Sequence, residues 1–189
     1  RGSTGHDLEE DAGHGMKKLQ FILGIHCHQP VGNFDSVFAM AFDRAYRPFL
    51  ERFEAVKDLK LVVHVSGCLL DWIRANRPEW LERLRALVAH GRVEMLTGGY
   101  YEPILPAVTE ADAVGQIRKL TRTLKSELGA DARGLWLTER VWEPHLPRVL
   151  RAAGVEYTVV DDAHFLRVGI PVERLDGYYL TEDGGEAVA

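Results

Sequence analysis

Glu139 is the residue most suggestive of chemistry in this sequence, because it places a carboxylate between two tryptophans directly after an apolar run. The apolar residues 134–137 predict a short buried strand. In α/β proteins, reactive groups collect where strands end, since the loops there vary while the sheet beneath holds them rigid. Trp136 and Trp142 offer flat apolar faces of the kind that stack on sugar rings. We predict that Glu139 is a nucleophile; the alternative is that Glu139 and Arg140 form an ordinary exposed pair.

Two histidines, His26 and His28, are separated by one residue near the end of the first apolar run. In an extended segment this spacing puts both imidazoles on one side, as in strand-one ligands of metal-dependent hydrolases. The same spacing also suits a sugar pocket, where imidazoles bond to hydroxyls without a metal, or two structural histidines. His64 lies inside an apolar run and is interpreted as a core histidine with a satisfied hydrogen bond.

Acidic residues follow, or interrupt, three other apolar runs. Glu94 lies within a strand-like run, where burying an unpaired charge is costly, so it faces either solvent or a polar pocket. Glu102 follows two tyrosines and belongs either to that pocket or to a surface turn. The last predicted strand is followed by Asp161, Asp162 and His164. These residues could be metal ligands, a clamp for sugar hydroxyls, or a polar loop with a helix cap.

Composition places the chain among ordinary globular proteins. It has 189 residues, 46% hydrophobic and 27% charged, with a net charge of -5 and a pI near 5.9. An acidic chain with scattered basic residues argues against nucleic acid and anionic membranes as partners. No run approaches the roughly 18 apolar residues of a membrane span, and no signal core is visible. Cys27 and Cys68 predict reduced, packed thiols and a cytoplasmic location.

The order of elements predicts a domain from Met16 onward, after a disordered leader or cloning remnant at residues 1–15. Strands and helices alternate five times, which implies a parallel sheet with right-handed crossovers. The predicted strands are 19–25, 59–65, 92–97, 134–137 and 156–160, and the predicted helices are 37–56, 69–75, 79–89, 109–128 and 145–153.

Both a doubly wound sheet and a barrel fit this alternation. Polar groups follow every one of the five strands, which favours a ring of loops converging on one pocket over a single switch point. We therefore predict an α/β barrel. Since such barrels typically need about 250 residues, five βα units are expected to be its N-terminal part, with the remainder missing.

Four segments together strongly resemble glycoside hydrolase family 57 in their order and spacing. They are HCHQPVGNF at 26–34, GRVE at 91–94, WLTERVW at 136–142 and DDAHF at 161–165. Within the family, the chain looks most like the 4-α-glucanotransferases. The resemblance extends from Met16 to the end of the sequence.

The resemblance implies an incomplete (β/α)7 barrel and retaining cleavage or transfer of α-1,4-glucans or maltooligosaccharides, without an obligatory metal or other cofactor. Retention needs a carboxylate that forms a covalent glycosyl-enzyme intermediate and a second carboxyl group that protonates the leaving oxygen. By motif, Glu139 resembles the nucleophile. The residues expected to bind substrate are His26, His28, Glu94, Trp136, Trp142, Asp162 and His164.

One departure from the family matters for activity. The family's acid/base aspartate belongs to a later motif that does not occur in these 189 residues, so we expect the chain to be a fragment that is inactive alone. Two other functions stay open from the residues: a metal-dependent hydrolase or deacetylase that uses His26 and His28 with Asp161 or Asp162, and a non-catalytic carbohydrate-binding piece.

Overall fold

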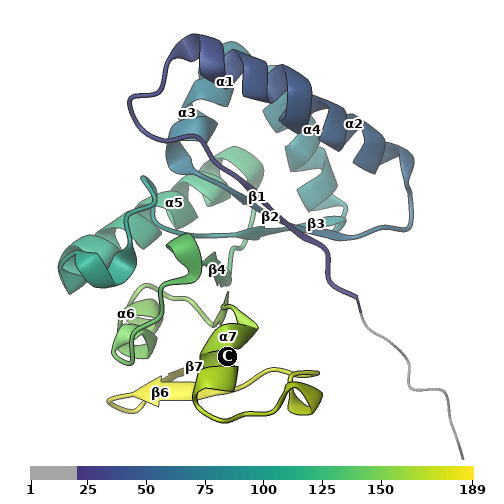
Figure 1. Cartoon of the computed structure of the whole chain (residues 1–189). Helices are drawn as coiled ribbons and strands as arrows, with labels where there is room; N and C mark the ends of the chain where they lie inside the picture. Colours follow the sequence, from purple (N-terminus) through teal and green to yellow (C-terminus); the bar gives the residue numbers. More distant parts are fainter. Residues whose placement is uncertain (1–20) are drawn as a thin grey trace, which may run out of the picture.

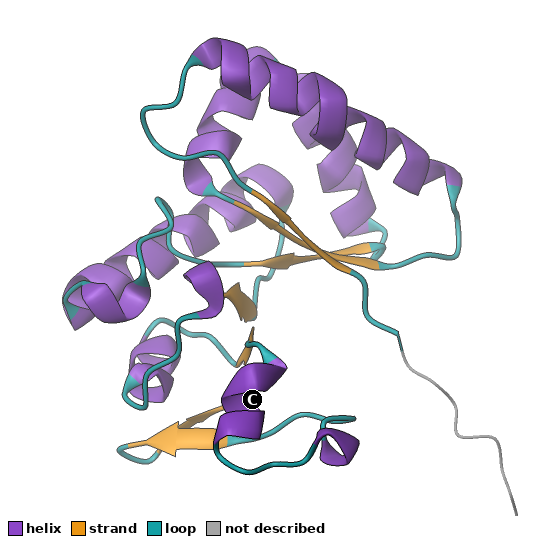
Figure 2. Ribbon diagram, in the orientation of Figure 1, coloured by secondary structure: helices purple, strands orange, loops and turns teal. Residues whose placement is uncertain are grey.

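The computed structural model describes residues 21–189 as an alternation of parallel strands and helices (Figures 1 and 2). The predicted leader and the first two residues of the first predicted strand lie outside the described residues. The strands are β1 Gly24–Cys27, β2 Leu61–Val65, β3 Val93–Leu96, β4 Gly134–Trp136, β5 Tyr157–Val159, β6 Thr181–Asp183 and β7 Glu186–Val188. The α-helices are α1 Asp35–Ala41, α2 Arg47–Ala55, α3 Gly67–Asn76, α4 Pro78–Ala89, α5 Glu110–Leu128, α6 Leu146–Ala152 and α7 Asp162–Arg167.

The first five strands are parallel and follow one another in chain order. β1, β2 and β3 form one sheet, β4 pairs with β5, and a parallel bridge between Thr97 and Leu135 joins the two sets. A doubly wound sheet would instead reverse direction from a central strand. The prediction of an α/β fold with a parallel sheet is therefore confirmed.

Two apolar cores hold the helices against the strands. In Figure 1, helices α1 to α4 lie on one side of β1, β2 and β3, and the first core fills the space between them. The second core joins β4 to α6 through Leu135, Leu137 and Val149. Helix α5 contributes Leu120 to the first core and Ile117 to the second, so it ties the two parts together.

Helix α5 follows the local rules that predicted it. The Thr109 hydroxyl accepts a hydrogen bond from the backbone N–H of Asp112, as an N-cap should. Gly129 ends the helix at φ 69°, a left-handed conformation that suits glycine. Of the apolar residues spaced at three- and four-residue intervals along the helix, 117, 120, 124 and 128 are buried, whereas Val114 is partly exposed.

The predicted helix 37–56 is interrupted in the structure. A π-helical turn, Phe42–Tyr46, separates α1 from α2, and Pro48 lies in the first turn of α2. Proline has no N–H to donate to the preceding turn, and the wider π-turn accommodates that missing bond. The three pieces follow one another directly, so the helical path continues past Pro48 to Ala55.

The boundary of the first strand is a correction. His26 was expected to begin a loop, but it lies inside β1, where it pairs with His64 in register. The ladder continues past the apolar run because the backbone pairing with β2 extends to Cys27.

The last residues form a hairpin. β6 and β7 pair in antiparallel fashion, and Gly184 and Gly185 connect them with positive φ. Within residues 21–189, no helix has both the length and the apolar content needed to cross a bilayer.

Candidate functional site

Three aromatic side chains lie at the carboxyl ends of β1, β2 and β4. His26 and His64 stand opposite each other in the β1–β2 register, with ring centroids 5.0 Å apart. Trp136 ends β4 and stacks on His26, with centroids 4.5 Å apart and an interplanar angle of 14°. His64 is completely buried, as the sequence predicted. The other polar groups of the site lie around these stacked rings.

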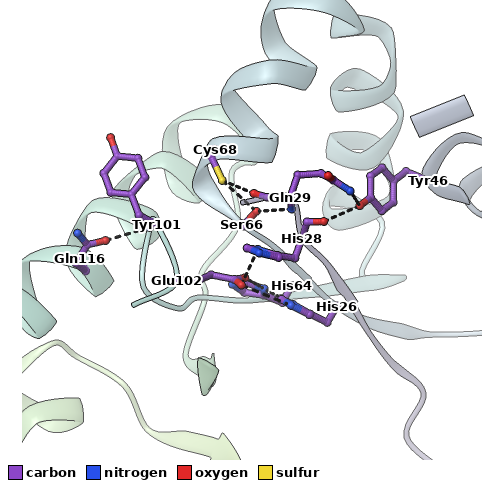
Figure 3. A network of polar contacts seen from close by, with 10 residues as sticks. All are labelled: His26, His28, Gln29, Tyr46, His64, Ser66, Cys68, Tyr101, Glu102 and Gln116. Carbon is purple, nitrogen blue, oxygen red and sulfur yellow. Dashed lines mark hydrogen bonds and ion pairs between the residues drawn. The ribbon is translucent and has the colours of Figure 1, made fainter. Parts of the chain in front are cut away.

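Glu102 is the centre of the cluster. It comes from the loop after β3, and its side chain is only 6% exposed. One carboxyl oxygen, Oε2, lies 2.6 Å from His28 Nδ1 and 3.6 Å from His26 Nε2, while Oε1 lies 3.3 Å from His64 Nδ1 (Figure 3). Of the two predicted placements for Glu102, the surface turn is therefore wrong.

The loop that carries Glu102 is held in an unusual conformation. Glu102 has φ 52°, which costs a non-glycine residue about 1–2 kcal/mol. Its N–H donates to the Gly99 carbonyl at 3.0 Å, and the N–H of Tyr101 donates to the Gln116 side chain at 3.0 Å. The carbonyl of Tyr100 accepts from the N–H of Gly67 at 2.8 Å. Contacts with α3 and α5 thus turn the carboxyl group inward.

Burial makes the groups of this cluster neutral. It raises the pKa of Glu102 to about 8, and the negative charge of Glu139 adds to the rise. Burial lowers the pKa of His26 to about 4, with contributions from His28 and Arg140, and it also lowers the pKa of His28. Near pH 7 the site therefore holds a protonated carboxyl group among uncharged imidazoles. The Glu102–His28 contact is then one between neutral polar groups.

We expect the raised pKa of Glu102 to make the fold less stable as pH rises from 6.5 to 8. An unfolded glutamate ionises near its ordinary pKa of 4.5, whereas folded Glu102 keeps its proton until about pH 8. The unfolded state therefore holds fewer protons, and the free energy of unfolding falls by about 1–2 kcal/mol across this window. His26 acts with the opposite sign, but only between about pH 4 and 6.5.

Urea unfolding at pH 6.5 and pH 8 measures this effect. Glu102→Gln keeps the shape of the side chain without an ionisable group, so its stability should change little between the two values. Exposed Glu82 on α4 supplies the matched control, since Glu82→Gln should retain the slope of the original chain. If Glu102→Gln lost as much stability between pH 6.5 and pH 8 as the original chain does, the raised pKa could not be assigned to Glu102.

Glu139 lies at the rim of the same cluster. It is exposed and has φ 53°, and the next residue, Arg140, has φ 51°. Two consecutive left-handed residues turn the chain sharply after buried Thr138, so the carboxylate stands clear of the core. Its negative charge acts on the pKa values of both Glu102 and His28. Glu139 therefore lies within electrostatic range of Glu102 and His28.

Arg140 is held by groups from the end of β5. Its guanidinium Nε donates to both oxygens of Asp161, at 3.1 and 3.3 Å, and its guanidinium carbon lies 5.9 Å from the centre of the Trp136 ring. His164 on α7 contacts the Arg140 carbonyl through Nε2 at 2.9 Å. His164 thus stabilises the loop that carries Glu139 rather than standing free in the pocket.

Three residues predicted to bind substrate lie outside this cluster. Asp162 is exposed on α7, and its neighbour Asp161 makes the contact with Arg140 instead. Trp142 packs against the second core. Glu94 is the second residue of β3, near its amino end, where it accepts a hydrogen bond from Tyr157. The direction of β3 explains why Glu94 lies away from the cluster, because only residues at the carboxyl ends of the parallel strands meet at this site.

A second layer of hydrogen bonds holds the backbone around His28. The Tyr46 hydroxyl donates to the His28 carbonyl at 2.8 Å, and Cys68 Sγ lies 2.6 Å from the Gln29 carbonyl (Figure 3). Ser66 accepts from the Gln29 N–H at 3.5 Å. Neither cysteine forms a disulfide, which confirms the prediction of free thiols.

The cluster can act in two chemical ways. Uncharged imidazoles and a protonated carboxyl group can donate to, and accept from, the hydroxyls of a sugar. Ligand-capable atoms of His26, His28 and Glu102 also lie within 4.8 Å of one another. Among the described residues, the carboxyl group close enough to share a metal ion with His26 and His28 is that of Glu102, not of Asp161 or Asp162, and Asp161 is paired with Arg140. From the sequence, Glu102 could belong either to a polar pocket or to a surface turn. The only feature that pointed to the pocket was a carboxylate after a strand, among aromatic residues.

Comparison with known proteins agrees with these features. The model of the family described as "Glycosyl hydrolase family 57" matches residues 22–188. The chain is 49% identical over 173 residues to a 4-alpha-glucanotransferase of Thermococcus kodakarensis, covering 92% of this chain and 26% of the relative. It is also 49% identical over 173 residues to an alpha-amylase of Pyrococcus horikoshii, covering 92% of this chain and 27% of that relative.

Solved structures include the crystal structure of 4-alpha-glucanotransferase from Thermococcus litoralis. It superposes with a TM-score of 0.86 at 50% identity, over 88% of this chain and 26% of that one. The chain therefore spans about a quarter of the length of the relatives it matches.

Proposed function

Because this chain belongs to glycosyl hydrolase family 57, we propose that it forms part of an enzyme that cleaves or transfers α-1,4-glucan chains with retention at the anomeric carbon. Relatives at 49% identity are named 4-alpha-glucanotransferase and alpha-amylase, which supports a glucan substrate. The sequential order of five parallel strands supports the finer fold assignment, the N-terminal part of a (β/α)7 barrel.

Glu139 is the proposed nucleophile, and the observation that carries the proposal is its position in the turn directly after β4, whose last residue, Trp136, stacks on His26. A carboxylate oxygen of Glu139 attacks the anomeric carbon while the glycosidic C–O bond breaks and the leaving oxygen takes a proton from an acid. A second sugar hydroxyl or water then releases the glycosyl group from the ester. A hydroxyl gives transfer, and water gives hydrolysis.

Glu102 does not fit the role of that acid. Its carboxyl group is protonated near pH 7, but it is 6% exposed and surrounded by three imidazoles. A glycosidic oxygen has no approach to a carboxyl group covered in this way. We propose that the acid is an aspartate of a later motif, in accordance with the family resemblance, and that Glu102 orients His28.

The sugar subsite is proposed to consist of His26 and His28, with Trp136 as its wall. The imidazole side chains are 26% and 33% exposed, so each presents an edge to a ligand. Stacking on Trp136 fixes the ring plane of His26. His164 and Asp161 have a positioning role, because they hold the loop of Glu139 through Arg140.

Binding of maltooligosaccharides to the chain, measured by calorimetry, tests the subsite independently of catalysis. We expect His28→Ala to weaken binding at least tenfold, about 1.4 kcal/mol or more, because hydrogen bonds to sugar hydroxyls are lost. His90→Ala is the matched control: His90 is exposed after α4 and bonds only to the Ala86 carbonyl at 2.6 Å. If the original chain and His28→Ala bound maltooligosaccharide equally well, this subsite would be excluded. Absence of binding by the original chain would exclude it too.

A further inference from the structure

We propose that His26, His28 and Glu102 also form a binding site for one divalent transition-metal ion of the zinc class, and that this ion and a glucan exclude each other. The site uses the imidazole edges that the proposed function gives to sugar hydroxyls. It differs in using Glu102 as a direct ligand, through the carboxylate that forms when the ion displaces the proton of the carboxyl group.

Two of the three separations between ligand atoms lie near the distance that such an ion requires, and all three atoms lie within 4.8 Å of one another. Zinc binds nitrogen and oxygen at about 2.0–2.2 Å, so tetrahedral ligands lie about 3.3 Å apart. Glu102 Oε2 is 2.6 Å from His28 Nδ1 and 3.6 Å from His26 Nε2, values on either side of that separation. Small side-chain rotations would open the first distance. Two nitrogens and one oxygen suit zinc, cobalt or nickel rather than calcium or magnesium.

The next layer around these ligands is also built as metal sites require. A ligating histidine commonly bonds through its other ring nitrogen to a fixed partner, which sets its orientation. His26 Nδ1 lies 2.9 Å from Nδ1 of His64, which is completely buried. Trp136 stacks on the His26 ring and restricts its rotation. The second nitrogen, Nε2, is thereby left pointing at Glu102.

Besides Nε2 of His64, two buried polar atoms in the site have no hydrogen-bond partner among the described residues. They are Oε1 of Glu102 and Nδ1 of His28, which touches Glu102 without hydrogen-bond geometry. Unsatisfied buried polar atoms cost about 1–3 kcal/mol each and are uncommon in folded proteins. Both belong to proposed ligands, and the Glu102 side chain is more than nine-tenths buried. A cation bound here would use both groups.

An open coordination position explains the competition with glucan. The His26 and His28 side chains are 26% and 33% exposed, so a fourth ligand from solvent can reach the ion. An ion at this position would occupy the lone pairs that sugar hydroxyls need. Exposed Glu139 adds a negative charge beside the site, which favours a cation there.

Equilibrium dialysis against zinc chloride, followed by elemental analysis, tests the site on the whole chain. We expect one zinc ion per chain, and at least a tenfold weaker affinity in Glu102→Gln and in His28→Ala. Cobalt should give the visible absorption of a tetrahedral N/O site. Two matched controls should keep the ion: His90→Ala, and the double variant His6→Ala/His14→Ala, which removes imidazoles outside the described residues.

The outcomes separate this proposal from the proposed function. No stoichiometric uptake by the folded chain, verified by circular dichroism, would overturn the metal site, as would uptake that survives in both Glu102→Gln and His28→Ala. Zinc affinity that maltooligosaccharide leaves unchanged, under conditions where the sugar is bound, would overturn the mutual exclusion. Zinc uptake without any sugar binding would leave the metal site standing and remove the sugar subsite.

Discussion

Glu139→Gln, placed in a longer protein that carries this segment and cleaves glucans, is expected to lower kcat/KM at least about 1000-fold. Glutamine has nearly the same shape but cannot form the glycosyl ester, so the loss appears in the chemical step. A factor of 1000 corresponds to about 4 kcal/mol of transition-state stabilisation. Release of glucose or larger sugars from maltoheptaose measures the rate.

The matched control is Glu143→Gln, because Glu143 is exposed and only four residues further along the chain. Its turnover should stay within about twofold of the original, as expected for a surface substitution. In Glu139→Ala, added azide should restore bond cleavage and yield a glycosyl azide of inverted configuration, since azide replaces the missing nucleophile. Unimpaired turnover in Glu139→Gln would remove Glu139 from the mechanism.

Gly98→Ala is expected to destabilise the fold by about 1–3 kcal/mol and to impair glucan binding at the same time. A Cβ atom at this position would lie 2.7 Å from Nε2 of His64 and 3.2 Å from the Trp136 carbonyl. Since His64 is completely buried, it cannot move away without disturbing the core. Any shift of its ring would also move His26, which it contacts at 2.9 Å.

Chemical denaturation and maltooligosaccharide calorimetry measure the two parts of this prediction. Gly115→Ala is the control within the same fold, because a Cβ there meets no atom within 4 Å. Gly115 lies inside α5, so alanine should stabilise the protein by up to about 1 kcal/mol. If Gly98→Ala matched the original chain in stability and binding, the tight contact around His64 would be refuted.

The helices were largely predictable because their signals are local. Thr109 and Gly129 bound α5 as expected, and its buried stripe follows the apolar spacing. The strands were located to within a few residues, but their ends were not, since hydrogen-bonding partners rather than side-chain polarity decide where a ladder stops. His26 shows this, because its pairing with β2 extends the strand beyond the apolar residues.

The candidate site was predictable where a motif and a strand end coincide. Glu139, His28 and Trp136 come from such positions, at or just after the carboxyl ends of β1 and β4, where His26 stacks with both His28 and Trp136. Glu94 and Trp142 also belong to motifs, yet they lie elsewhere. A sequence motif indicates which residues matter. It does not indicate on which side of the sheet, or at which end of a strand, their side chains lie.

The amino-acid sequence alone was sufficient for the family and for the alternation of strands and helices, because these depend on residue type and spacing along the chain; it also singled out Glu139 as the candidate nucleophile. The position of Glu102 inside the site was decided only by the tertiary structure. Its position depends on a left-handed backbone conformation and on contacts with helices α3 and α5, distant in sequence. Its proton and the neutral state of the imidazoles arise from burial, which no linear pattern encodes.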